Sequence, residues 1–253
     1  ALNFADTAVK AIRMETLHLY DNAIKIIAEV IGFSKSEIAS GIDLEALIKA
    51  NKPLQEINID EKYSADIKGI YSAIIAFISN AKVDSKMVQS SDIHWLRKAN
   101  ISIVESIKAT KHLQKNMLKY SRSENEFCRQ EYQNMRLSLA LLLRELEEIK
   151  FTADPEIKIL AIDSIKLSMK KAEERINQVI DELIRSEKIK PETGSSMIND
   201  SYYLFQIKTN LVTFFETLFA TPRRTLTNSV RKIALNEDEI NEVSERIDIE
   251  KAN

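Results

Sequence analysis

The chain has 253 residues, which is enough to bury the core of one large domain or two small ones. Only four glycines and four prolines are present, so few positions can interrupt a helix, and the composition predicts an all-helical protein. Lys plus Arg number 36 against 38 Asp plus Glu, and a net charge of -2 argues against binding to DNA or RNA.

Apolar residues recur three and four positions apart along most of the chain, which predicts six long helices. The first should cover 3–31, with Gly32 as its stop. The others are expected at 61–82, 86–121 and 123–150, then from 155 with an apolar seam reaching 183, and finally along 197–218. Because the links between successive long helices are short, neighbours should be antiparallel.

Local signals predict where several helices begin. Ser123 and Glu126 have the spacing of a capping box, so the helix at 123–150 should start at Ser123. Asp154 followed by Pro155 predicts an N-cap and first turn. Pro191 and Gly194 are expected to break the chain before the last long helix.

The chain is predicted to have three parts. Residues 1–121 form a three-helix group with a broken connector at 32–60, residues 122–220 form a second three-helix group, and residues 221–253 form a tail of short helices. Within the connector we expect a capping box at Ser34 and Glu37, and a short amphipathic turn from Asp43 to Ala50.

The sequence offers one weak candidate for a metal site. Glu15 and His18 form the Glu-x-x-His pair that helical bundles use in di-metal centres. A full centre needs a second such pair and further carboxylates, and the other two histidines have no Glu three residues before them. A solvated or interface histidine is therefore the favoured interpretation, and no cofactor is predicted.

Enzyme chemistry is not indicated. Cys128, the single cysteine, lies on the apolar seam of the 123–150 helix and should be a buried thiol, which fits a reducing compartment. The isolated glycines form neither a phosphate-binding loop nor a dinucleotide fingerprint. We therefore predict that the chain is not an enzyme and has no small-molecule substrate.

Two segments are candidates for interaction. Arg223 and Arg224 begin a small basic cluster in the tail that could contact an acidic partner or anionic lipid, although a solvated helix face is the favoured interpretation. Asn199 and Asp200 are expected at the start of a tyrosine-rich helix, where they could either cap the helix or contact a partner.

Three polar residues of the 123–150 helix are expected at the edge of the core or on the surface. They are Tyr132, which falls on the apolar seam of the helix, Arg136 and Arg144.

Four segments of the chain together resemble the cytoplasmic C-terminal portion of bacterial sodium/phosphate cotransporters, which is PhoU-like. They are IYSAIIAFISNAK (70–82), SIKATKHLQKNMLKY (106–120), EYQNMRLSLALLLRELEEI (131–149) and MINDSYYLFQIKTNL (197–211). The resemblance extends from residue 1 to about 220 and consists of helical patterns rather than a sharp motif. The acidic metal motif of PhoU proteins is not matched on a predicted helix, since only Glu56 and Asp60 have its spacing, so metal binding is not carried over.

The resemblance implies a PhoU-like bundle that regulates a membrane transporter from the cytoplasmic side of the bacterial inner membrane. Its partner would be the membrane-embedded part of the same polypeptide or a second copy of itself. A helical pattern that is already present by Phe4 leads us to expect a preceding membrane part. Two alternatives stay open: a free-standing PhoU-type regulator of phosphate signalling, and a helical scaffold unrelated to phosphate.

Overall fold

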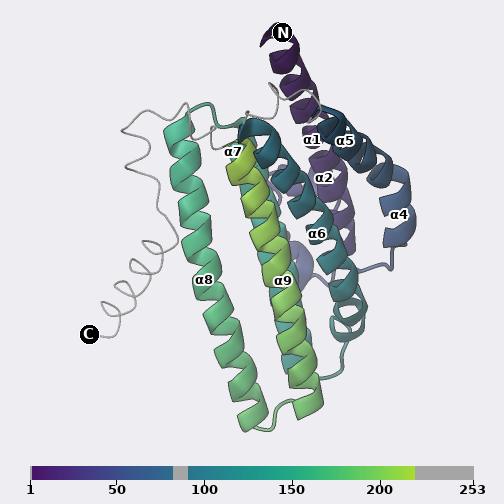
Figure 1. Ribbon diagram of the computed structural model, residues 1–253. Coiled ribbons are helices and arrows are strands. Elements are labelled where there is room, and N and C mark those ends of the chain that lie inside the picture. The colour runs from purple at the N-terminus through teal and green to yellow at the C-terminus, as the bar shows by residue number, and fades with distance from the viewer. Residues whose placement is uncertain (1, 82–90, 220–253) are drawn as a thin grey trace.

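The computed structural model describes residues 2–81 and 91–219, and within these ranges the chain is all-helical with no strand (Figure 1). The prediction of an all-α bundle is confirmed. The short helices expected at 221–253 lie outside the described residues. The helices are α1 (Leu2–Val30), α2 (Lys35–Ala39), α3 (Leu44–Lys49), α4 (Ile59–Asp66), α5 (Lys68–Ala81), α6 (Ser91–Tyr120), α7 (Glu126–Phe151), α8 (Pro155–Arg185) and α9 (Pro191–Leu218).

The long helices run antiparallel along the chain, and α9 lies between α8 and α6 (Figure 1). The α7–α8 turn is at the same end of the bundle as the start of α1 and the end of α9. Arg13 on α1 donates to the Leu218 carbonyl at this end. None of the helices in the described ranges combines the length and the apolar content needed to cross a bilayer.

The buried apolar residues form one continuous core to which both predicted three-helix groups contribute. Its aromatic centre joins α1 to α9, because the Tyr20 ring stacks on Phe214 with centroids 4.8 Å apart and meets Phe215 edge-on at 5.2 Å. The Tyr20 hydroxyl donates to Glu147 on α7 at 3.0 Å. Cys128 is also buried, as predicted. The division into three parts stays a prediction.

Several predicted helix starts are confirmed. Ser34 and Glu37 form both bonds of a capping box at α2. The short amphipathic turn expected from Asp43 to Ala50 is the helix α3, which Asp43 caps by accepting from Ala46 N. Asp154 caps α8 ahead of Pro155 in the first turn, as predicted. These signals depend only on residues within one turn, which explains their success.

The predicted capping box at Ser123 is wrong. The N-cap of α7 is Asn125, whose side chain accepts from Cys128 N at 3.0 Å. Ser123 instead accepts from the backbone N–H of Asn125, in the turn before the helix. Asn125 also donates to the Lys188 carbonyl at 2.8 Å, a contact from a distant segment that favours its position as the cap.

The predicted helix at 61–82 is not continuous. It is divided at the buried Ile67 into α4 and α5, and it begins earlier, at Ile59 with Asn58 as N-cap. Beside the break, Asn22 on α1 donates to the Asp66 carbonyl at 2.9 Å. A side chain that binds a helix carbonyl in this way is a known cause of local helix distortion.

The last long helix also begins earlier than predicted. Pro191 occupies its first turn rather than breaking the chain, and Gly194 lies inside the helix. Gly194 is buried because α9 approaches α8 closely here: a Cβ atom would lie 2.4 Å from Ile184 Cδ1. This glycine therefore serves helix packing rather than helix termination.

Two arginines on α7 hold the connector between α1 and α4. Arg136 is 2% exposed, and its guanidinium donates to the Ile31 carbonyl at 2.9 Å and the Lys52 carbonyl at 3.1 Å. Arg144 donates to the Glu37 and Ile38 carbonyls of α2 at 3.1 Å and 2.9 Å. The sequence had placed both at the core edge or surface, which is wrong for Arg136 because its partners remove it from solvent.

The turn that ends α1 should be sensitive to a single methyl group. Gly32 has φ +80, and a Cβ atom there would lie 2.8 Å from Arg136 Nη2 and 3.0 Å from the Pro53 carbonyl oxygen. We expect Gly32→Ala to lower the free energy of unfolding by about 1–3 kcal/mol in urea denaturation, from backbone strain and displacement of Arg136.

Gly41→Ala is the matched control, because a Cβ atom at Gly41 meets nothing within 4 Å. Equal stability of the two variants would contradict the role given to Gly32.

Candidate functional site

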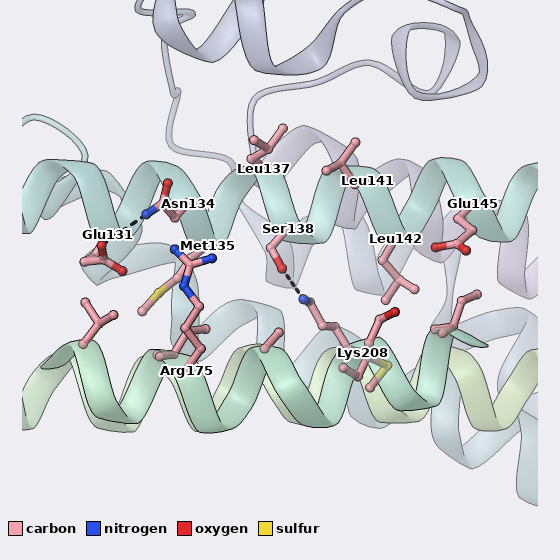
Figure 2. Close-up of a pocket in the computed structure, with 16 residues that line it drawn as sticks. Glu131, Asn134, Met135, Leu137, Ser138, Leu141, Leu142, Glu145, Arg175 and Lys208 are labelled. Atoms are coloured by element: carbon pink, nitrogen blue, oxygen red, sulfur yellow. Dashed lines mark hydrogen bonds between the residues drawn. The ribbon is translucent and has the colours of Figure 1, made fainter. Parts of the chain in front are cut away.

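A groove of about 350 Å³ lies between α7 and α8, with one residue of α9 in its wall (Figure 2). Its lining is mainly apolar, and the exceptions are concentrated on α7. The lining residues are Glu131, Asn134, Met135, Leu137, Ser138, Leu141, Leu142 and Glu145 of α7, Ile165, Ser168, Met169, Ala172, Arg175, Ile176 and Val179 of α8, and Lys208 of α9.

Lys208 is the most unusual residue of the groove. Its side chain is contributed by the α9 face that carries Leu204 and Leu211, and it is only 7% exposed. The ammonium group donates to the Ser138 hydroxyl, midway along the α7 side of the groove (Figure 2). Burial lowers the pKa of Lys208 to about 8, because desolvation disfavours the charged amine.

The carboxylates of the groove lie away from this amine. Glu131 and Glu145 stand seven residues before and after Ser138, which corresponds to about 10 Å along the helix axis in each direction. Burial raises the pKa of both glutamates. Asn134 donates to Glu131 at 3.1 Å, and the positive charge of Arg175 partly offsets the rise in the Glu131 pKa.

This arrangement can bind an apolar group and an anion together. Lys208 is buried in the apolar wall, and a buried cation attracts a negative charge more strongly than one on the surface. Pockets for small ligands are typically apolar with a few placed polar groups, as here.

Sequence reasoning missed Lys208, although a signal was present. Lys208 lies four residues after Leu204 and three before Leu211, so the 3.6-residue period places it on the apolar stripe of the helix. Arg136 has the same relation to Tyr132 and Leu139. A position inside an apolar stripe is thus the pattern that Lys208 and Arg136 share.

The Glu15 and His18 pair exists but gains no further ligand. His18 Nδ1 lies 3.8 Å from Glu15 Oε2, and both side chains are mostly exposed. Among the described residues, no three His, Cys, Asp or Glu side chains come together as a metal site would require.

Asn199 and Asp200, the candidate interaction residues on α9, lie in different environments. Because α9 begins at Pro191, Asn199 and Asp200 lie inside the helix rather than at its start, so the predicted capping role is wrong. Asn199 is exposed, whereas Asp200 is 1% exposed and belongs to the core. Arg223 and Arg224 lie outside the described residues.

Asp200 is paired with a buried tyrosine. The Tyr132 hydroxyl donates to Asp200 Oδ2 at 2.5 Å, and Tyr132, which had also been expected at the core edge, is fully buried and stacks on Tyr120. Burial raises the pKa of Asp200, while hydrogen bonds from Tyr132 and Asn116 act in the opposite direction. These bonds connect α7 and α6 to α9.

Removing the buried charge should stabilise the protein. Since the lowered pKa of Lys208 reflects the cost of its charge, we expect Lys208→Met to raise the free energy of unfolding by about 1–3 kcal/mol at neutral pH. The unfolded lysine has a pKa of about 10.4, so wild-type stability recovers as pH rises from about 8 toward that value. The advantage of the variant should shrink over the same range in urea denaturation.

Lys115→Met, which replaces an exposed lysine on α6, should follow the wild-type profile. A stability difference between Lys208→Met and wild type that does not vary with pH would contradict the assignment.

Loss of the Tyr132 hydroxyl should be costly and pH-dependent. We expect Tyr132→Phe to destabilise the fold by about 1–3 kcal/mol near neutral pH, because ionised Asp200 loses a buried donor. The carboxyl pKa would then rise further. The cost should therefore be smaller at low pH, where Asp200 is protonated, and grow as pH rises through the Asp200 pKa.

Thermal or urea denaturation across acidic and neutral pH checks this expectation. Tyr202→Phe is the control, because Tyr202 is 58% exposed on the same helix as Asp200, and it should change stability by no more than about 0.5 kcal/mol.

No protein-family model, curated protein or solved structure matches the chain.

Proposed function

We propose that the chain is a regulatory and interaction domain of a bacterial sodium-dependent phosphate transporter. In this proposal it contacts the membrane-embedded part of the same polypeptide from the cytoplasmic side and modulates phosphate uptake. The domain acts by binding through helix surfaces and performs no chemical step itself.

The resemblance to PhoU-like transporter portions supports the proposal. Its four segments fall on α5, α6, α7 and α9, apart from Lys82, which lies outside the described residues. These helices share the continuous core, so the resembling parts belong to one packed unit. A bundle of long helices is a suitable rigid platform for contact with a partner.

The observation that carries the proposal is a group of exposed apolar side chains around the α7–α8 turn. We define the turn patch as Phe151, Ile157 and Leu160, which are 79%, 54% and 51% exposed. Ile157 and Leu160 are three residues apart on α8 and share one face of it. Large apolar side chains gathered at one exposed place are typical of surfaces that bind a partner.

The position of the turn patch agrees with a membrane part that precedes residue 1. The α7–α8 turn and the start of α1 are at the same end of the bundle (Figure 1). A transporter part joined to α1 would therefore be adjacent to the turn patch. Contact through these side chains would transmit the state of the bundle to the transporter.

Binding and transport measurements test the proposal. In the full polypeptide that carries this chain, replacing Phe151 and Ile157 together by Ser should change sodium-dependent phosphate uptake. The same double replacement in the separate domain should weaken its binding to the membrane part by at least about tenfold, because apolar contact area is lost.

Ile198→Ser is the matched control, since Ile198 is 41% exposed near the start of α9, at the other end of the bundle. It should leave both measurements unchanged. If the domain does not bind the membrane part, and its complete deletion does not alter uptake, the proposal fails. A free-standing regulator or an unrelated scaffold would then be the better account.

A further inference from the structure

We propose that the groove between α7 and α8 binds a small amphiphilic anion, a free carboxylate on an apolar chain, with its headgroup on Lys208 and its chain between the two helices. This binding site is independent of the transporter proposal, because it depends only on the groove and its buried amine. A medium-chain carboxylate such as decanoate represents the class.

Lys208 carries a buried positive charge that no carboxylate of the described residues balances. The side chain is more than nine-tenths buried, and its hydrogen bond goes to the neutral hydroxyl of Ser138. In the described part of the chain, no carboxylate forms an ion pair with Lys208. A buried cation without an anion is costly, so an incoming anion gains more here than at the surface.

The other charged groups of the groove lie away from the Lys208 ammonium group. Glu131 is engaged by Asn134 and by the charge of Arg175, which extends from α8 toward α7 beside it (Figure 2). Glu145 lies at the opposite end of the labelled row, away from Lys208. Arg175 is therefore balanced by Glu131, whereas Lys208 is left with an unused positive charge in the middle of the groove.

Apolar side chains line the groove around the Lys208 amine. Leu142 points from α7 toward Lys208 in the same view as Ser138 (Figure 2). Ile165, Met169 and Ile176 contribute apolar walls from α8. A volume of about 350 Å³ is at the small end of ligand pockets, which span roughly 300–1,000 Å³. The groove thus suits a small molecule with one apolar chain.

The charge pattern also selects the headgroup. A doubly charged phosphate is usually held by several donors, such as backbone N–H groups or arginine forks. At the middle of this groove the donors are the Lys208 ammonium and the Ser138 hydroxyl, while Arg175 lies beside Glu131 and the carboxyl groups of Glu131 and Glu145 lie toward the ends. A singly charged carboxylate fits one ammonium without adding an unpaired second charge.

Calorimetric titration of the purified chain with decanoate tests the proposal at concentrations below micelle formation. Decanoate should bind, and decanol and decylamine should bind at least about tenfold more weakly. Across shorter carboxylates, each added CH₂ should tighten binding by about three- to fourfold until the groove is filled.

Two variants separate the headgroup from the chain. Lys208→Met should weaken decanoate binding at least about tenfold and leave the weak decanol binding unchanged. Ala172→Leu should weaken both ligands, because Ala172 lines the groove and a larger side chain there fills it. Lys115→Met should bind decanoate like the wild type.

Proton uptake gives a second readout. An anion beside Lys208 raises its lowered pKa, so binding near pH 8 should take up part of a proton from the buffer. Titrations in buffers with different ionisation enthalpies measure this uptake. This proton uptake should be absent in Lys208→Met, which lacks the amine but keeps Glu131 and Glu145.

Three outcomes would overturn the inference. The first is equal affinity for decanoate and decanol, and the second is decanoate binding that survives Lys208→Met. The third is no binding of decanoate by the folded wild-type chain. Sedimentation with vesicles of anionic phospholipid distinguishes the source of the anion. Lys208-dependent binding to vesicles without binding of free decanoate would assign the site to a lipid headgroup and reject a free carboxylate.

Discussion

The buried guanidinium of Arg136 is the interaction on which the arrangement of α7 depends. The last carbonyls of a helix have no partner within it, and Arg136 satisfies that of Ile31, at the end of α1, together with one of the connector. Gly32 leaves the space that this side chain occupies. With α7 attached in this way to α1 and the connector, its opposite side is available to face α8, where Ser138 and Leu142 line the groove.

Arg136 and Lys208, the buried cations among the described residues, have different surroundings. Arg136 donates to carbonyl dipoles and lies 5.8 Å from the centroid of the Phe33 ring, so its charge is satisfied within the fold. Burial lowers its pKa only to about 10, where it remains protonated at neutral pH. Lys208 has a single hydroxyl partner and borders open space. Only the second cation leaves an interaction for a ligand to complete.

Part of the candidate site could have been found in the sequence. The positions of Lys208 and Arg136 within apolar stripes were visible, and both proved to be buried. The sequence also predicted the helices that carry them. It could not predict that Ser138 meets Lys208, or that Asp200 meets Tyr132, because helical periodicity orients a face without choosing its neighbour. The caps at Ser34 and Asp154 were predictable because they depend on neighbouring residues alone. The choice of Asn125 rather than Ser123 as the N-cap of α7 also involves the distant Lys188 carbonyl, to which Asn125 donates.

By itself, the sequence determined that the described chain is helical, where most of its long helices lie and which of their faces are apolar. These properties follow from residues within about four positions of one another. The tertiary structure decided where the helix at 61–82 breaks and which polar groups are buried. It did so through contacts that span the chain: Arg136 with Ile31, Lys208 with Ser138 and Tyr132 with Asp200 are 105, 70 and 68 residues apart. Burial makes such contacts obligatory, because a polar group removed from water must find its partner wherever the fold places one.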